Sequence, residues 1–266
     1  MNIRQKNILE LLQKHERLDI ATAAEKFAVS EMTIRRDLRY LESQKYILQI
    51  KNGAVAHPAQ YEPESILANL NDMKFDLANV LYDKLFPCKK IFIGTGTTCL
   101  AFAKTVARRN ALPLTVITHS LSVASALFRS KCKVILLGGE LRTTSMDLVG
   151  AAAERSLTEY KVDWLVSGCD GALADYGFYT SDMRLSHLER ETISIAEKVA
   201  IITESNKFGK RSITRFAARE EVSLLVTDSD ISETDAGKLK ACGIELCTVQ
   251  IQGSNEQTYP GETTDK

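Results

Sequence analysis

A loop of small and hydroxyl-bearing residues, Gly94-Thr95-Gly96-Thr97-Thr98, has the composition of an anion-binding site. It follows a short apolar run and leads into a predicted helix that begins near Cys99. Glycines let backbone N–H groups approach a phosphate, threonine hydroxyls donate further hydrogen bonds, and a helix N-terminus adds positive potential. A tight strand-to-helix turn would use the same residue types, so the loop alone leaves both interpretations open.

The loop differs from two common nucleotide-binding motifs. A P-loop ends in Gly-Lys-Ser/Thr, and no lysine follows here. A dinucleotide fingerprint needs Gly or Ala at the position of Cys99 and an acidic residue about twenty positions later, where this chain has Thr118-His119. We therefore expect no cofactor at this loop. The sequence also shows no Cys-x-x-Cys pair or histidine cluster, so no metal site is predicted.

Polar residues follow several other apolar runs, and they would converge on this loop if those runs form parallel strands. Lys207 is favoured because a lysine in a strand-end loop can contact a phosphate or a carboxylate. His119 is either a hydrogen-bonding partner of a ligand or an ordinary strand-end residue, and Arg142 is interpreted as solvated surface. The candidate ligand-binding residues beside the loop are Thr118, His119, Gly138, Gly139, Asp170, Gly171 and Lys207.

Alternating patterns predict the elements that would position these residues. Short apolar runs rich in β-branched residues alternate with helical patterns from residue 91 onward. The runs cover 91–93, 114–117, 133–137, 164–166, 199–202, 222–226 and 244–249. This alternation predicts an α/β domain with a mostly parallel sheet that is covered on both faces.

The first fifty-odd residues have the pattern of a winged helix-turn-helix. Two short helices are predicted over 4–14 and 20–27, followed by a third over 30–44 with Ser30 as its N-cap. Apolar residues form one stripe of that third helix, so a cationic face points away from the core. A strand over 46–50 and the turn signal Asn52-Gly53 predict the wing. The candidate DNA-binding residues are Ser30, Met32, Thr33, Arg35, Arg36, Arg39 and Lys51.

Bulk composition limits the classes of protein that fit. The 34 basic and 34 acidic residues cancel, which argues against binding nucleic acid through overall charge. We expect a cytoplasmic protein that has no membrane partner, because no stretch of eighteen apolar residues and no apolar leader is present. The predicted organisation is a DNA-binding domain over 1–57, a linker over 58–65, a ligand-binding domain over 66–252 and a disordered tail over 253–266.

With these motifs, the chain resembles the DeoR family of bacterial regulators of sugar metabolism from Arg4 to about Val249. The most specific stretch is Val29-Ser30-Glu31-Met32-Thr33-Ile34-Arg35-Arg36-Asp37-Leu38, which matches the family's recognition helix. The resemblance implies a sensor domain like ribose-5-phosphate isomerase and glucosamine-6-phosphate deaminase. It also implies repression of carbohydrate operons and release from DNA when a phosphorylated sugar binds, with 94–98 as the phosphate loop.

Three segments depart from the family pattern. At the wing the family usually has Leu-x-Arg-x-His-Gly-Gly-Ala, and this chain has Leu48-Gln49-Ile50-Lys51-Asn52-Gly53-Ala54, with Lys51 as the basic residue. Thr118-His119 replaces Thr-Asn, and Glu204-Ser205-Asn206-Lys207-Phe208 replaces Asp-x-Ser-Lys-Phe. Two alternatives to a sensor domain stay open from the sequence. Asp170, Asp182, Glu189 and Lys207 could serve acid–base isomerisation of a sugar phosphate, or the domain could only assemble copies of the chain. A homo-oligomer is expected, because regulators of this architecture usually bind repeated half-sites.

Overall fold

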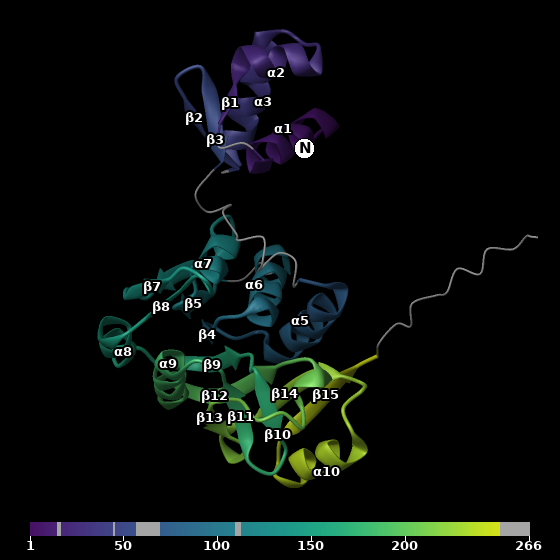
Figure 1. Ribbon diagram of the computed structural model, residues 1–266, viewed down its shortest axis with the longest axis vertical. Helices are drawn as coiled ribbons and strands as arrows, with labels where there is room; N and C mark the ends of the chain where they lie inside the picture. Colours follow the sequence, from purple (N-terminus) through teal and green to yellow (C-terminus); the bar gives the residue numbers. More distant parts are fainter. Residues whose placement is uncertain (15–16, 45, 57–69, 110–112, 251–266) are drawn as a thin grey trace, which may run out of the picture.

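The computed structural model describes residues 1–14, 17–44, 46–56, 70–109, 113–250. The predicted linker over 58–65 and the tail over 253–266 lie outside these residues. The N-terminal part has one hydrophobic core, built from residues 8–54. A separate C-terminal part has two hydrophobic cores, both built from residues 70–249. Figure 1 shows the two corresponding domains, with the smaller one at the N-terminal end.

The N-terminal domain is the predicted winged helix-turn-helix. Its elements are α1 (Ile3–Lys14), β1 (Leu18–Asp19), α2 (Ile20–Phe27), α3 (Glu31–Ser43), β2 (Ile47–Ile50) and β3 (Gly53–Ala56). Asp19 caps α2 and Ser30 caps α3 with their side-chain oxygens, as helix N-termini require. The strands pair in the order β1-β3-β2.

The wing turn differs slightly from its prediction. Ile50 pairs with Gly53, so the two-residue turn is Lys51-Asn52, and Asn52 adopts the positive φ of 62° that such turns need. Gly53 lies in β3 rather than in the turn. A Cβ at Gly53 would lie 2.3 Å from the Leu18 carbonyl oxygen, so the glycine allows β1 to pair closely with β3.

The C-terminal domain is built on a seven-stranded parallel sheet in the order β15-β14-β12-β9-β4-β5-β6. These strands are β4 (Lys90–Ile93), β5 (Thr115–Thr118), β6 (Lys133–Leu136), β9 (Val162–Ser167), β12 (Ala196–Ile202), β14 (Leu224–Asp228) and β15 (Glu245–Val249). Each predicted apolar run corresponds to one strand of this sheet, which confirms the predicted fold class.

Side chains of the sheet alternate between two cores. Phe92 packs into one core, whereas its neighbours Ile91 and Ile93 pack into the other, as the period of a strand requires. One face is covered by α5 (Asp72–Leu85), α6 (Thr97–Arg109) and α7 (Leu121–Leu127). The other is covered by α8 (Ala151–Leu157), α9 (Met183–Ser194) and α10 (Glu233–Ala241).

Three groups of short elements were absent from the sequence-based prediction. An antiparallel sheet is formed by β10 (Gly171–Leu173), β11 (Gly177–Thr180) and β13 (Thr214–Ala218). It packs into the same core as Phe92, on the face of the parallel sheet that α8, α9 and α10 cover. The strands β7 (Glu140–Arg142) and β8 (Asp147–Val149) form a hairpin after β6. Two 3-10 helices, η2 (Ser205–Lys207) and η3 (Arg219–Glu221), complete the described chain. No helix in the described part of the chain is long and apolar enough to cross a membrane.

Candidate functional site

The outward face of α3 carries the predicted DNA-binding side chains. Ile34, Leu38 and Leu41 are fully buried beneath it. Met32 is 67% exposed, and Arg36 and Arg39 are exposed without an ion pair among the described residues. The resulting surface presents free guanidinium groups on a helix, which is the arrangement that contacts phosphates and base edges in a major groove.

The other candidates on this surface have more local roles. The Ser30 hydroxyl accepts a hydrogen bond from the Thr33 backbone N–H at 3.3 Å and thereby caps α3. Arg35 is partly engaged by Glu31 at 3.3 Å, on the same helix. Lys51 is exposed at the tip of the wing. All seven candidates thus lie on or beside α3 and the wing.

Asp37 is a residue of this domain whose role the sequence did not indicate. Its side chain is buried under α3, where it accepts hydrogen bonds from Arg4 Nε at 2.6 Å and from Gln5 Nε2 at 2.8 Å. Both donors belong to α1, so this carboxylate holds α3 against α1. An acidic residue inside an arginine-rich segment resembles a solvated charge in the sequence, and only the distant partners show its structural role.

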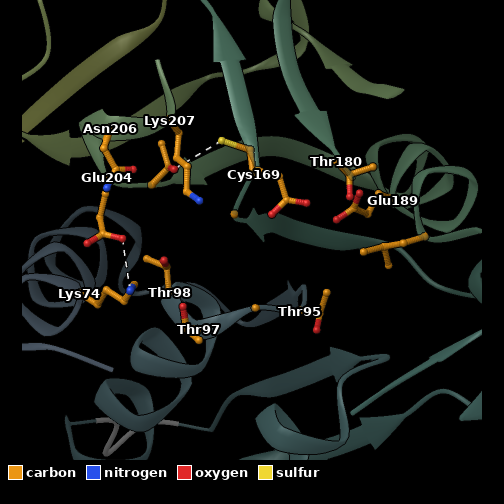
Figure 2. A pocket seen from close by; sticks show the side chains of 15 residues that line it. Lys74, Thr95, Thr97, Thr98, Cys169, Thr180, Glu189, Glu204, Asn206 and Lys207 are labelled. Carbon is orange, nitrogen blue, oxygen red and sulfur yellow. Dashed lines mark hydrogen bonds and ion pairs between the residues drawn. The ribbon is translucent and has the colours of Figure 1, made fainter. Parts of the chain in front are cut away.

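A cavity of ≈ 500 Å³ opens where the loops after β4, β9 and β12 meet at the carboxyl edge of the sheet (Figure 2). Thr95, Gly96, Thr97 and Thr98 form one wall at the N-terminus of α6. Gly96 adopts a φ of 96°, which glycine tolerates far better than other residues, and a Cβ there would meet no atom within 4 Å. The turn lies at the first residues of α6, where backbone N–H groups have no partner within the helix, as an anion site requires.

Cations and carboxylates face this wall. Lys207 is half-buried, points into the cavity and makes no ion pair with any described residue (Figure 2). Lys74 of α5 pairs with Glu204 at 3.2 Å. Asp170 accepts hydrogen bonds from the backbone N–H and the hydroxyl of Ser181, at 2.8 and 2.6 Å. The cavity can therefore offer both charges and hydrogen-bond acceptors to a polar ligand.

Glu189 of α9 also lines the cavity, and its Oε2 is buried without a hydrogen-bond partner among the described residues. Burial, followed by the nearby charge of Asp170, raises its pKa to about 8. The side chain is therefore mostly a neutral acid at pH 7. A carboxylic acid can donate as well as accept a hydrogen bond, so Glu189 is suited to a ligand hydroxyl.

A second cavity of ≈ 500 Å³ adjoins the first and shares Thr95, Gly96, Thr97, Asp170 and Leu185 with it. Arg142 on its wall is bound to Asp147 through two hydrogen bonds of 2.7 Å and also to Asp182, the N-cap of α9. The interpretation of Arg142 as solvated surface is therefore wrong, because its side chain is only 10% exposed. Its partners were invisible in the sequence since they come from a hairpin and from a distant helix.

The structure brings together some of the predicted ligand-binding residues but not all of them. The loop 95–98, Asp170 and Lys207 line the first cavity, and Gly94 lies directly before that loop. Thr118, His119, Gly138, Gly139 and Gly171 line neither cavity.

Two of the residues outside the cavities have other evident roles. His119 is fully buried against Phe92, with ring centroids 5.7 Å apart, and burial lowers its pKa to about 4. A Cβ at Gly171 would lie 2.5 Å from the Lys210 carbonyl oxygen, so this glycine permits close backbone packing. The cavity residues that sequence reasoning missed include Lys74, Ser120 and Ser122. No group of three or more side chains suited to holding a metal ion is found in the described part of the chain.

Comparison with known proteins agrees with both domains. Residues 4–59 match the family model of the DeoR-like helix-turn-helix domain, and residues 71–229 match that of the DeoR C terminal sensor domain. The chain is 32% identical to the transcriptional repressor AccR of Agrobacterium fabrum, over 89% of this chain and 94% of that protein. It is 26% identical to a putative aga operon transcriptional repressor of Escherichia coli O157:H7, over 92% of this chain and 93% of that protein. Ribose 5 phosphate isomerase A of Neisseria gonorrhoeae aligns at 17% identity and a TM-score of 0.41, over 53% of this chain and 54% of that chain.

Proposed function

Because the chain belongs to the DeoR family of transcriptional regulators, we propose that it represses carbohydrate-metabolism genes and that a phosphorylated sugar controls its affinity for DNA. The chain is a DNA-binding regulator through its N-terminal domain. We place its action in the cytoplasm and expect a homo-oligomer on repeated half-sites. The isomerase alternative is not adopted, since the relatives are named as repressors.

The observation that carries this proposal is the loop 95–98 at the N-terminus of α6, which faces Lys207 across a cavity, a lysine that has no ion pair among the described residues. A phosphate there would accept hydrogen bonds from the backbone and gain charge attraction from the lysine. Asp170 and the neutral Glu189 line the same cavity and suit the hydroxyl groups of a sugar. A ligand with a phosphate at one end and hydroxyls at the other fits this distribution of groups.

Fluorescence anisotropy on a duplex from upstream of its own gene tests the proposal. One phosphorylated sugar should change the Kd for DNA at least tenfold, and the free sugar should have no effect. Lys207→Gln should weaken the response to the phosphorylated sugar, because it removes the cation that faces the loop. Lys210→Gln is the matched control, since Lys210 is exposed and lines neither cavity. DNA binding that ignores every sugar phosphate would refute the sensor function but keep the regulator.

A further inference from the structure

A cation–aromatic contact joins the DNA-binding domain to the sensor domain. The guanidinium carbon of Arg129 lies 3.4 Å from the centroid of the Tyr46 ring. Arg129 follows α7, which lies at the end of the sensor domain next to the winged helix-turn-helix (Figure 1). Tyr46 is half-buried, and burial lowers the pKa of Arg129, so the contact is partly shielded from water. Shielding strengthens an arginine–aromatic contact.

Tyr46 is coupled to both DNA-contacting elements of its domain. Its backbone N–H donates to the Leu41 carbonyl oxygen at 2.9 Å, near the C-terminal end of the recognition helix α3. The next residue, Ile47, begins the wing strand β2 and is fully buried. A shift of the Tyr46 ring would therefore change how the wing and α3 sit relative to the sensor domain.

The other end of α7 is built into the second cavity. Ser120 caps the helix by accepting from the Val123 N–H at 3.3 Å, and Ser120 and Ser122 both line the cavity. The Leu121 N–H donates to the Met146 carbonyl oxygen at 2.8 Å. This bond ties the first turn of α7 to the β7–β8 hairpin.

The hairpin itself is held by the charged groups of the same cavity. Leu148 donates its backbone N–H to the His119 carbonyl oxygen at 2.8 Å, and Asp147 holds Arg142 through two hydrogen bonds. A ligand group that contacts Arg142 or Ser120 would therefore be able to displace the first turn of α7.

We propose that α7 transmits the state of the second cavity to the DNA-binding domain through the Arg129–Tyr46 contact. The helix has seven residues and spans about 10 Å, so a displacement of its first turn is carried to its end as a rigid shift. The use of this contact to respond to a bound sugar rests on the function proposed above. The coupling itself is reciprocal, because a free energy that links two sites acts in both directions. DNA bound to α3 must then alter α7 without any sugar present.

Hydrogen exchange of the full chain, with and without an upstream DNA duplex, tests this coupling. In the wild type, DNA should slow exchange over 31–56 and also over 121–129, where we expect a change of about threefold or more. In Arg129→Gln and Tyr46→Leu, DNA should still slow exchange over 31–56, which shows that the variant is folded, but the effect over 121–129 should disappear. Tyr46→Phe keeps the ring and should keep the effect.

The matched control is Arg155→Gln on α8, an exposed arginine that lines neither cavity. It should behave as the wild type. The inference is overturned if DNA leaves 121–129 unchanged in the wild type, or if the change survives Arg129→Gln, since direct shielding by DNA would survive it. The hydrogen-exchange experiment contains DNA and no sugar, so its outcome does not depend on sugar binding. If DNA binding ignores every sugar phosphate, the proposed sensor function is refuted, and the coupling between α7 and the DNA-binding domain is still tested.

Discussion

Glu189→Gln should stabilise the sensor domain at neutral pH and remove much of its pH dependence. The pKa of Glu189 rises from 4.5 in the unfolded chain to about 8 in the fold, through burial and then the charge of Asp170. Between these values the folded chain keeps a proton that the unfolded chain has released, so the free energy of unfolding falls as pH rises from 4.5 to about 8. One proton gives a slope of about 1.4 kcal/mol per pH unit. pH 7 is roughly 2.5 units above the pKa of the carboxyl in the unfolded chain. At this pH the carboxyl lowers the free energy of unfolding by about 3 kcal/mol relative to an uncharged amide at the same position.

Urea unfolding monitored by tryptophan fluorescence measures this effect in the correct domain, because the single tryptophan, Trp164, lies in β9. The variant should unfold at higher urea than the wild type at pH 7, and the difference should shrink to below about 1 kcal/mol near pH 5. Glu191→Gln, on the same helix, is the control and should follow the wild type. Parallel pH profiles for Glu189→Gln and the wild type would refute the reasoning, since they would mean that Glu189 is ionised in the fold.

Three further predictions concern the two binding surfaces. Arg36→Ala should cost about 1–3 kcal/mol on the cognate DNA and relax base preference at one position, as measured by anisotropy; an equal loss on all sequences would make Arg36 a phosphate contact only. Asp37→Asn should lower the free energy of unfolding of the N-terminal domain by about 1–2 kcal/mol, because Arg4 loses a buried charged acceptor; an unchanged thermal melt would contradict this. Gly96→Ala should strain the loop by about 1–2 kcal/mol without a steric clash and weaken the binding of a phosphorylated sugar in calorimetry; wild-type affinity would show that the loop does not hold the phosphate.

The parallel sheet was predictable because its strands are buried on both faces. Runs such as Ile91-Phe92-Ile93 consist of apolar residues only, since consecutive side chains enter two different cores. The recognition helix was predictable for a related reason, as Ile34, Leu38 and Leu41 recur at helical spacing. In both cases the local pattern and the packing agree.

Parts of the site were not predictable, because they depend on partners far away in the chain. Arg142 looks like a surface residue until Asp182, forty positions later, meets it in space. His119 follows a strand just as a ligand-binding residue would, yet the chain turns it inward against Phe92. Strands as short as Gly171–Leu173 carry too few residues to show an alternating pattern, so the small antiparallel sheet was missed.

The separate hydrophobic cores of the two domains make the chain a pair of exchangeable parts. No buried residue of the N-terminal cluster belongs to either cluster of the sensor domain in the described chain, so a different DNA-binding domain could replace residues 1–56 without disturbing the hydrophobic clusters of the sensor domain. In a hybrid regulator, the difficulty would then be to keep the coupling between the two domains, and not to keep each domain folded. By the coupling proposed above, a transplanted DNA-binding domain that lacks an aromatic ring at the position of Tyr46 would bind its operator but would not respond to the sensor domain.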